Sequence, residues 1–156
     1  MRSTALAQIP VGVVVERRKA ESIWVDFLWR PVSVFVGVPS AAPWTVLDME
    51  AETTLFFAGE AVIELHRTET KNYRDNLTSA APLLWVALRA VVSERPYEIL
   101  TVTADPAEGE ALTDAGSNLV EAVSMPPEVV DAVVRVIAQH HVARPFVKRQ
   151  RHRQVP

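Results

Sequence analysis

The stretch that decides the fold is LLWVALRAVVSERPYEILTVT, residues 83–103. Two runs rich in strand-forming residues, Leu83–Val92 and Tyr97–Thr103, flank the polar tetrapeptide Ser93–Pro96. Two such runs with a short turn between them are typical of a β-hairpin. This pattern predicts two neighbouring antiparallel strands and a fold built by hairpin connections.

The chain before and after this hairpin continues the β pattern. Further strands are predicted over five regions: Val11–Val15, Ile23–Val36, Trp44–Met49, Thr53–Leu65 and Leu119–Val123. Within the fourth region, Gly59-Glu60 separates Thr53–Ala58 from Ala61–Leu65, which predicts a hairpin with a tight turn. Pro31 lies inside the second region and indicates a bulge, a bend or an edge strand.

Two helices are predicted after the strands. Asp105 has the properties of an N-cap, because Pro106 and Glu108 follow it at the positions that favour a helix start. The expected helix is short, near residues 106–113, and ends by Gly116.

The second predicted helix opens at Pro127 and runs to about Val142, before Pro145. Its apolar stripe recurs at helical spacing and consists of Val129, Ala132, Val133, Val136, Ile137 and His140. Strands do not alternate with long helices, so a parallel doubly wound sheet is not expected. The predicted class is α+β: a mostly antiparallel curved sheet or small barrel, a short helix and a C-terminal helix.

The charge of the chain is divided unevenly along its length. The 156 residues carry a net charge of −3, with 49 % hydrophobic residues, as expected for one globular domain. Residues 1–143 hold 11 of the 16 basic and all 19 acidic side chains, a net charge of −8. We therefore predict a single domain over residues 1–143 and a basic tail over residues 144–156.

Several functional classes are disfavoured by what the sequence lacks. Without cysteine there are no disulfides, thiolate metal sites or cysteine nucleophiles, which fits a reducing cytoplasm. Without a His-x-x-x-His pair or a glycine-rich phosphate loop, neither a metal centre nor a bound cofactor is expected. No run of about 18 apolar residues is present, and residues 1–10 are too weakly apolar for a signal peptide, so no membrane association is expected.

A dense polar block at residues 64–77 is the candidate ligand or partner site. Its candidate residues are Glu64, His66, Arg67, Lys71, Tyr73, Arg74 and Asp75. Strand alternation places the first two of these side chains on the same face, where a carboxylate can orient an imidazole and raise its basicity. No catalytic residue is assigned on this pattern alone.

The block after His66 reads as a capped short helix or an ordered loop. On a helical turn, Arg67, Lys71 and Arg74 converge on a phosphate or carboxylate, which would make a small anionic ligand the occupant. The alternative is a solvated connection with exposed ion pairs, which contribute little to stability. The two differ in whether the key side chains share one cleft: Glu64, His66, Arg67, Tyr73, Arg74 and Asp105.

Two further charged features have simpler interpretations. Asp26 and Arg30 share a strand face and are predicted to form a half-buried ion pair; the alternative is a polar group in a pocket lined by Trp24 and Trp29. The basic tail is too short for specific DNA recognition, and the acidic body opposes binding of nucleic acid. We expect the tail to be disordered, or to dock on the acidic body or on a partner.

Separated blocks of the chain resemble a known family. They are Ile9–Arg18, Trp24–Pro31, Leu65–Thr70 with Asn72–Leu77, Val102–Ala111, and His140–Val142 followed by Phe146–Arg149. Together they resemble an uncharacterised bacterial family classed as a domain of unknown function. Genes of that family often lie beside those of molybdenum-dependent formate dehydrogenases, and the family supplies no catalytic residues.

The resemblance implies a non-catalytic accessory or binding protein. Its expected role is to assist the assembly, maturation or regulation of a molybdenum-dependent formate dehydrogenase system, with a protein as its partner. The alternative is a small anionic-ligand binding domain or an enzyme that uses the 64–77 block. A third interpretation, a nucleic-acid binder acting through its basic tail, is disfavoured by the charge distribution.

Overall fold

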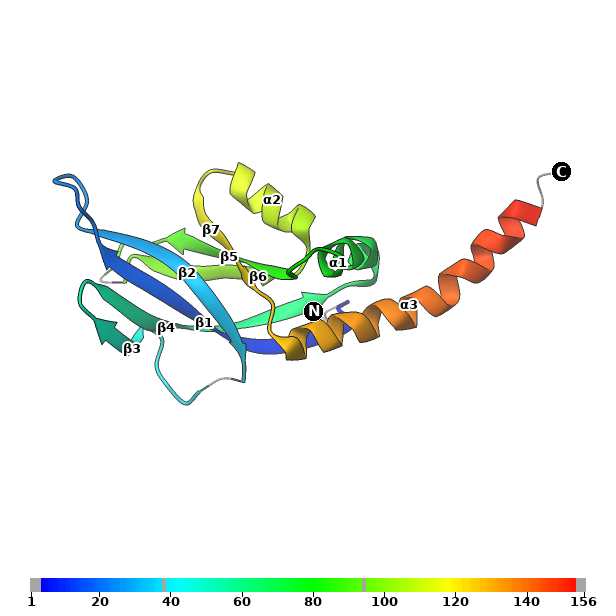
Figure 1. Cartoon of the computed structure of the whole chain (residues 1–156), viewed down its shortest axis with the longest axis horizontal. Helices are drawn as coiled ribbons and strands as arrows, with labels where there is room; N and C mark the ends of the chain where they lie inside the picture. The colour runs from blue at the N-terminus through cyan, green and yellow to red at the C-terminus, as the bar shows by residue number, and fades with distance from the viewer. Residues whose placement is uncertain (1–3, 38, 94, 154–156) are drawn as a thin grey trace.

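The computed structural model describes residues 4–37, 39–93 and 95–153, with side chains as far as His140. The described elements follow one another in the order β1 (Ala7–Lys19), β2 (Phe27–Val36), β3 (Thr45–Glu50), β4 (Thr53–Leu65), η1 (Arg67–Glu69), α1 (Thr70–Leu77), β5 (Leu83–Ala90), β6 (Tyr97–Thr103), α2 (Pro106–Asp114), β7 (Asn118–Ser124) and α3 (Pro127–Arg153) (Figure 1). The predicted α+β class is confirmed, and so is the hairpin of β5 and β6.

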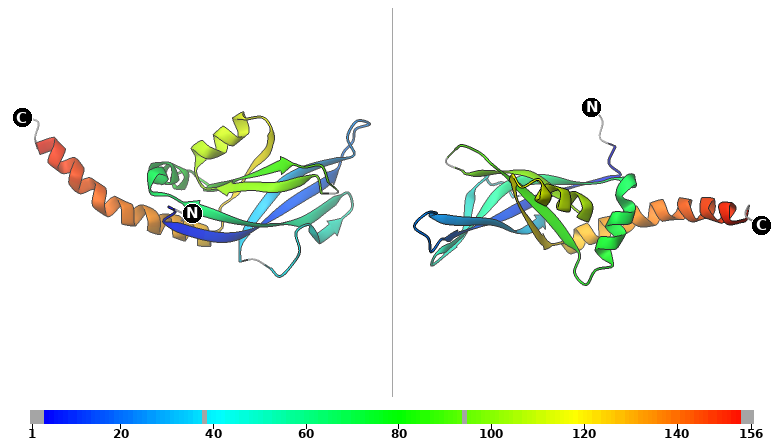
Figure 2. Two further views of the ribbon diagram at one scale, coloured as in Figure 1. Left: turned by 180° about the vertical axis from the view of Figure 1, so that it is seen from behind. Right: turned by 90° about the horizontal axis from the view of Figure 1, so that it is seen from above.

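The strands form two antiparallel sheets. One has the order β2-β1-β4-β3 and the other β6-β5-β7. The sheets approach at two places, where β4 runs along β6 and β2 runs along β7. Figures 1 and 2 show the second sheet stacked over part of the first. The described strands do not join into one closed barrel, so of the two predicted forms the open antiparallel sheet is the correct one.

The core lies between the sheets and against the first turns of α3. Inward-facing side chains of β1 and β4, such as Val13 and Ile63, are fully buried. The predicted stripe of α3 supplies Val129, Val133 and Val136, which join the same cluster. Burial of this apolar surface fixes the helix beside α1, with which it is in contact.

The predicted hairpin at Gly59-Glu60 is wrong, because β4 is one continuous strand. Val13 of β1 pairs with Gly59 and Val14 pairs with Phe57, so Ala58 is an extra residue in the ladder. Gly59 has φ +135°, a conformation that glycine adopts readily. The glycine therefore creates a β-bulge that bends the strand without reversing it.

The second predicted strand begins later than expected. Residues 20–26 form the turn between β1 and β2, and Asp26 lies there, outside the strand. Arg30 lies opposite Glu16 on β1, and its Nε is 3.1 Å from Glu16 Oε1. The predicted Asp26–Arg30 ion pair is therefore wrong, whereas Pro31 does lie at a register shift, as predicted.

The predicted short helix after His66 is present as α1, but no side chain caps its start; the other difference among the helices is at the C-terminus. Asp105 caps α2 with Pro106 in the first turn, as expected. The long helix does not end near Val142 but continues through Pro145 to Arg153 and projects beyond the sheets (Figure 1). A proline inside a helix removes one main-chain hydrogen bond and disfavours the helix, whereas Ala143, Arg144, Lys148 and Arg149 near it are good helix formers. The side chains of the predicted basic tail, residues 144–156, lie outside the described part.

No helix in the described part of the chain is both long and apolar enough to cross a membrane.

Candidate functional site

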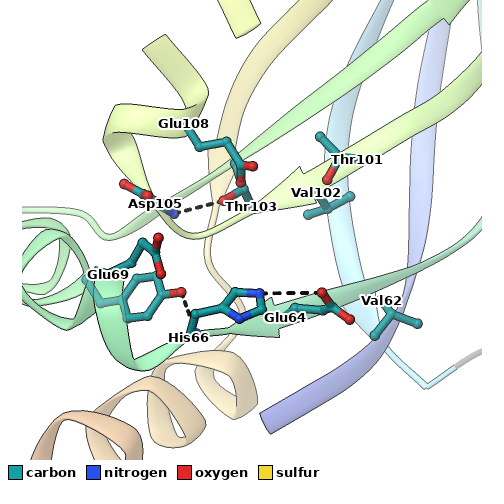
Figure 3. Close-up of a pocket in the computed structure, with 10 residues that line it drawn as sticks. Val62, Glu64, His66, Glu69, Thr101, Val102, Thr103, Asp105 and Glu108 are labelled. Atoms are coloured by element: carbon teal, nitrogen blue, oxygen red, sulfur yellow. Dashed lines mark hydrogen bonds and ion pairs between the residues drawn. The ribbon is translucent and has the colours of Figure 1, made fainter. Parts of the chain in front are cut away.

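The main candidate site is a cleft where the end of β4 meets the end of β6. Its volume is about 170 Å³, and α1 and the first turn of α2 close two of its sides (Figure 3). The lining residues are Val62, Glu64, His66, Glu69, Tyr73, Thr101, Val102, Thr103, Asp105 and Glu108. The cleft therefore combines residues from both sheets and from two helices.

The β4 wall of the cleft carries the predicted carboxylate–imidazole pair. His66 Nε2 lies 3.4 Å from Glu64 Oε1, and about a third of the imidazole is exposed. Gln8 on the neighbouring strand donates to Glu64 Oε2 over 3.1 Å. Alternation at the end of β4 places both side chains on one face, as predicted, and the bond from Gln8 helps to hold the carboxylate beside the imidazole (Figure 3).

Tyr73 forms a buried side of the cleft. Only 2 % of it is exposed, and its hydroxyl accepts a hydrogen bond from the His66 N–H over 2.8 Å. Burial raises the pKa of Tyr73 to about 12; the bond from His66 lowers it, and the nearby charges of Glu69, Asp105 and Glu108 raise it. The phenol therefore stays protonated at neutral pH and ties α1 to the end of β4.

Asp105 forms the opposite side through its role as a helix cap. Its Oδ1 accepts from the Ala107 N–H over 2.9 Å, and its own N–H donates to Thr103 Oγ1 over 3.1 Å. Only 8 % of the residue is exposed. The cap fixes where α2 starts and thereby places Glu108 at the cleft.

Gly109 holds α2 close to the sheet. A Cβ atom at this position would lie 2.3 Å from Cγ of Trp85 on β5, so only glycine fits without movement. Glycine disfavours helix by about 1 kcal/mol relative to alanine, and the close approach explains its presence. The glycine therefore positions the acidic first turn of α2 over the cleft.

Asn76 is the positioning residue that the sequence analysis missed. Its Nδ2 donates to the carbonyls of Leu83 (2.7 Å) and Ala104 (3.0 Å), and its Oδ1 accepts from the Leu83 N–H (2.9 Å). With 4 % exposure, it joins α1 to the start of β5 and the end of β6. The sequence feature that could have identified Asn76 is its position three residues after Tyr73, on the same face of the helix.

The cleft gathers acidic rather than basic side chains. Six residues were expected to share one cleft if the polar block is a ligand site. Four of them line this cleft: Glu64, His66, Tyr73 and Asp105. Two carboxylates that were not among the predicted site residues join them, Glu69 and Glu108. Four carboxylates and one imidazole favour a cationic occupant.

The remaining predicted residues are exposed and point elsewhere. Arg67 lines a shallow hollow near the N-terminal strand that also touches His66, and Arg74 lines an apolar hollow between α1 and α3. Lys71 and Asp75 are exposed on α1. The three basic side chains therefore do not meet in the cleft.

The side chains that line the cleft are not arranged as a metal centre. Within the described residues, no group of three or more histidine, aspartate or glutamate side chains is arranged to hold a metal ion. The carboxylates of the cleft can recognise a cation, and the Glu64–His66 pair can take part in acid–base chemistry.

Comparison with known proteins places the chain in a family. Residues 10–150 match the family described as "Protein of unknown function (DUF3305)", and this match covers most of the chain. The chain therefore belongs to that family. No curated protein and no solved structure matches it.

Proposed function

We propose that this member of the DUF3305 family is a non-catalytic accessory protein that binds a partner protein. The finer proposal is that the partner belongs to a bacterial molybdenum-dependent formate dehydrogenase system, whose assembly, maturation or regulation the protein assists in the cytoplasm. That part is supported by the resemblance to a family encoded beside such dehydrogenases.

The observation that carries the proposal is the size and charge of the cleft. At about 170 Å³ it is smaller than the roughly 300–1,000 Å³ of typical small-molecule sites, and suits a single side chain. Its carboxylates match a guanidinium, which forms paired hydrogen bonds with carboxylates. The proposed occupant is an arginine, or less favourably a lysine, of the partner.

The use of the polar groups also favours recognition over catalysis. Asp105 caps a helix and Tyr73 accepts a main-chain hydrogen bond, so both support the fold. Glu69 and Glu108 are more exposed than these two residues, and Glu64 lines the same cleft beside His66. Binding a preformed charge needs no more than this arrangement.

A second candidate function is favoured by the Glu64–His66 pair. A carboxylate beside an imidazole is the start of general-base chemistry, and the alternative of a small-ligand site at the 64–77 block rests on it. Thermal unfolding in the presence of nucleotides, pterins, formate and phosphate tests this alternative. A rise in melting temperature that is lost in His66→Ala would support it.

Affinity capture from the native host tests the first candidate. Tagged wild-type protein is expected to retain a subunit, chaperone or cofactor enzyme of the dehydrogenase system, and E69Q/E108Q is expected to lose it. Glu110→Gln is the matched control, since it removes an exposed charge from the same helix outside the cleft. Failure to recover any such component, with normal dehydrogenase activity in a deletion strain, would contradict the proposal.

A further inference from the structure

We infer that the occupant is an extended basic segment of the partner, which lies along the β4–β6 boundary and places two basic side chains in two neighbouring hollows. This inference rests on the proposed function and specifies the chemistry of the partner. It starts from a second hollow, of about 350 Å³, beside the acidic cleft. The residues that matter in it are Trp44, Gly59, Glu60, Tyr97 and Ile99.

The two hollows lie along the same pair of strands. On β4, Glu60 lines the second hollow while Val62 and Glu64 line the cleft, and alternation puts all three on one face. On β6, Ile99 lines the second hollow and Thr103 lines the cleft. The two strands therefore run side by side in the same sense, and a ligand following them meets both hollows.

At this boundary an edge of one sheet faces an edge of the other, and β4 and β6 are in contact without pairing in one sheet. β3 pairs with β4 only over Thr53–Phe57, so the rest of β4 has a hydrogen-bonded neighbour only in β1 among the described strands. β6 is likewise the outer strand of its sheet. Extended peptides that follow a strand are recognised through pockets for alternate side chains, and the two hollows at this boundary offer such pockets.

The second hollow suits a cationic side chain that stacks on an aromatic ring. Trp44 has φ +68°, which is rare for a bulky residue. Its indole is held in place by Trp29 and Phe56, with ring centroids at 5.9 and 5.8 Å. A preformed indole beside a carboxylate binds guanidinium through cation–π and ionic attraction together.

Glu60 is the carboxylate available in this hollow. Glu98 also lines it, but it pairs with Arg89 on the adjacent strand, and Arg95 contributes one positive charge. Together with the cleft, the boundary carries carboxylates at Glu60, Glu64, Glu69, Asp105 and Glu108. The surplus of negative charge opposes nucleic acid and a second acidic body, and it selects a basic segment.

The strand geometry sets the spacing of the two anchors. Glu60 and Glu64 are four residues apart, or about 13 Å at the rise of a β-strand. An extended peptide covers that distance with residues i and i+4, whose side chains point to the same face. Residue i+2 then faces Val62, which is 49 % exposed, so a basic–x–apolar–x–basic pattern is the expected motif.

The experiment measures binding of two dye-labelled, end-capped peptides with the same composition to the full chain. One is Arg-Thr-Val-Thr-Arg and the other is Arg-Arg-Thr-Val-Thr. The spaced peptide is expected to bind roughly tenfold more tightly, because its second contact is intramolecular. Glu60→Gln is expected to abolish this preference, whereas Glu50→Gln, an exposed charge on β3, is expected to keep it.

Equal affinity for the two peptides would overturn the inference. If E69Q/E108Q then weakens both equally, the cleft still takes a basic side chain and the proposed function survives. If neither peptide binds wild-type protein more tightly than it binds E69Q/E108Q, the extended site and the basic-side-chain cleft both fail.

Discussion

Key side chains in two regions, the polar block at residues 64–77 and the apolar turn at residues 20–26, have an exposure opposite to what hydropathy suggests. In the polar block, Tyr73 and Asn76 are 2 % and 4 % exposed and hold the fold together. In the apolar turn, Ile23 and Trp24 are 90 % and 87 % exposed. The polar side chains of the block are buried because they satisfy main-chain groups. The apolar side chains of the turn are exposed because the turn extends beyond the sheets.

Hydrogen-bond partners, not hydropathy alone, decide which residues support the site. Asn76 satisfies three main-chain groups of two different strand ends, which no apolar side chain does. The turn is closed locally, by the Ala20 N–H to Asp26 O bond of 3.0 Å and the Trp24 N–H to Ser22 Oγ bond of 3.1 Å. Substitution of the buried residues Tyr73 and Asn76 of the block should therefore destabilise the protein, and substitutions in the turn should not.

The largest expected effect is that of Asn76→Ala. Loss of the Asn76 side-chain amide leaves two main-chain carbonyls and one main-chain N–H without their partner at a largely buried position. The free energy of unfolding is therefore expected to fall by about 3 kcal/mol. Urea unfolding measures this, with Lys71→Ala on the exposed face of α1 as the control. A loss below about 1 kcal/mol would mean that Asn76 does not join the elements as described.

Gly109→Ala is expected to destabilise the protein by about 2 kcal/mol, because the new methyl group overlaps the Trp85 ring. Helix propensity alone predicts the opposite sign, a gain of about 1 kcal/mol. The matched control is Glu110→Ala, in the same helix and exposed. If Gly109→Ala were the more stable protein, α2 would not pack against β5 as tightly as described.

Tyr73→Phe is expected to cost about 1 kcal/mol at neutral pH, since the His66 N–H loses its acceptor. The pKa of Tyr73 is about 12 in the folded protein and about 10 in the unfolded chain. The stabilisation of the fold by its protonated phenol is therefore complete below pH 10. As the pH rises from 10 to 12, the unfolded chain loses the proton first and stability falls. Wild type should therefore lose more stability than Tyr73→Phe over that window in urea unfolding.

The smallest expected effect is in the turn. Trp24→Ala should change the unfolding free energy by no more than about 0.5 kcal/mol, because the indole is almost fully exposed. Thermal unfolding of the wild type and the variant checks this. A loss above about 1 kcal/mol would show that the indole packs on the protein and would remove the contrast between the two regions.

The sequence predicted those parts of the fold that depend on local patterns. The hairpin of β5 and β6, the cap at Asp105 and the shared face of Glu64 and His66 all follow from turn chemistry or alternation. The hairpin within β4 was wrong because a bulge and a turn both use glycine, and only pairing with β1 distinguishes them. The Asp26–Arg30 pair was wrong because the partner of Arg30 lies across the sheet, on β1.

The composition of the cleft was only partly predictable. Four of its residues were singled out, but Glu69 and Glu108 enter it through the packing of α1 and α2 against the sheet edges. Arg67, Lys71 and Arg74 share a segment with the cleft residues and still face other surfaces. Proximity in sequence did not determine which charged side chains meet in the cleft. The expected charge of a small ligand therefore changed from negative to positive.

Recognition of a basic side chain by the cleft is tested most directly by an NMR titration of the isotope-labelled full chain with N-acetyl-arginine amide. Amide shifts are expected to move mainly within residues 62–69 and 101–108, and these changes are expected to be lost in E69Q/E108Q but kept in Glu110→Gln. Shifts spread evenly over the acidic surface, or unchanged by the double substitution, would contradict recognition of a basic side chain by this cleft.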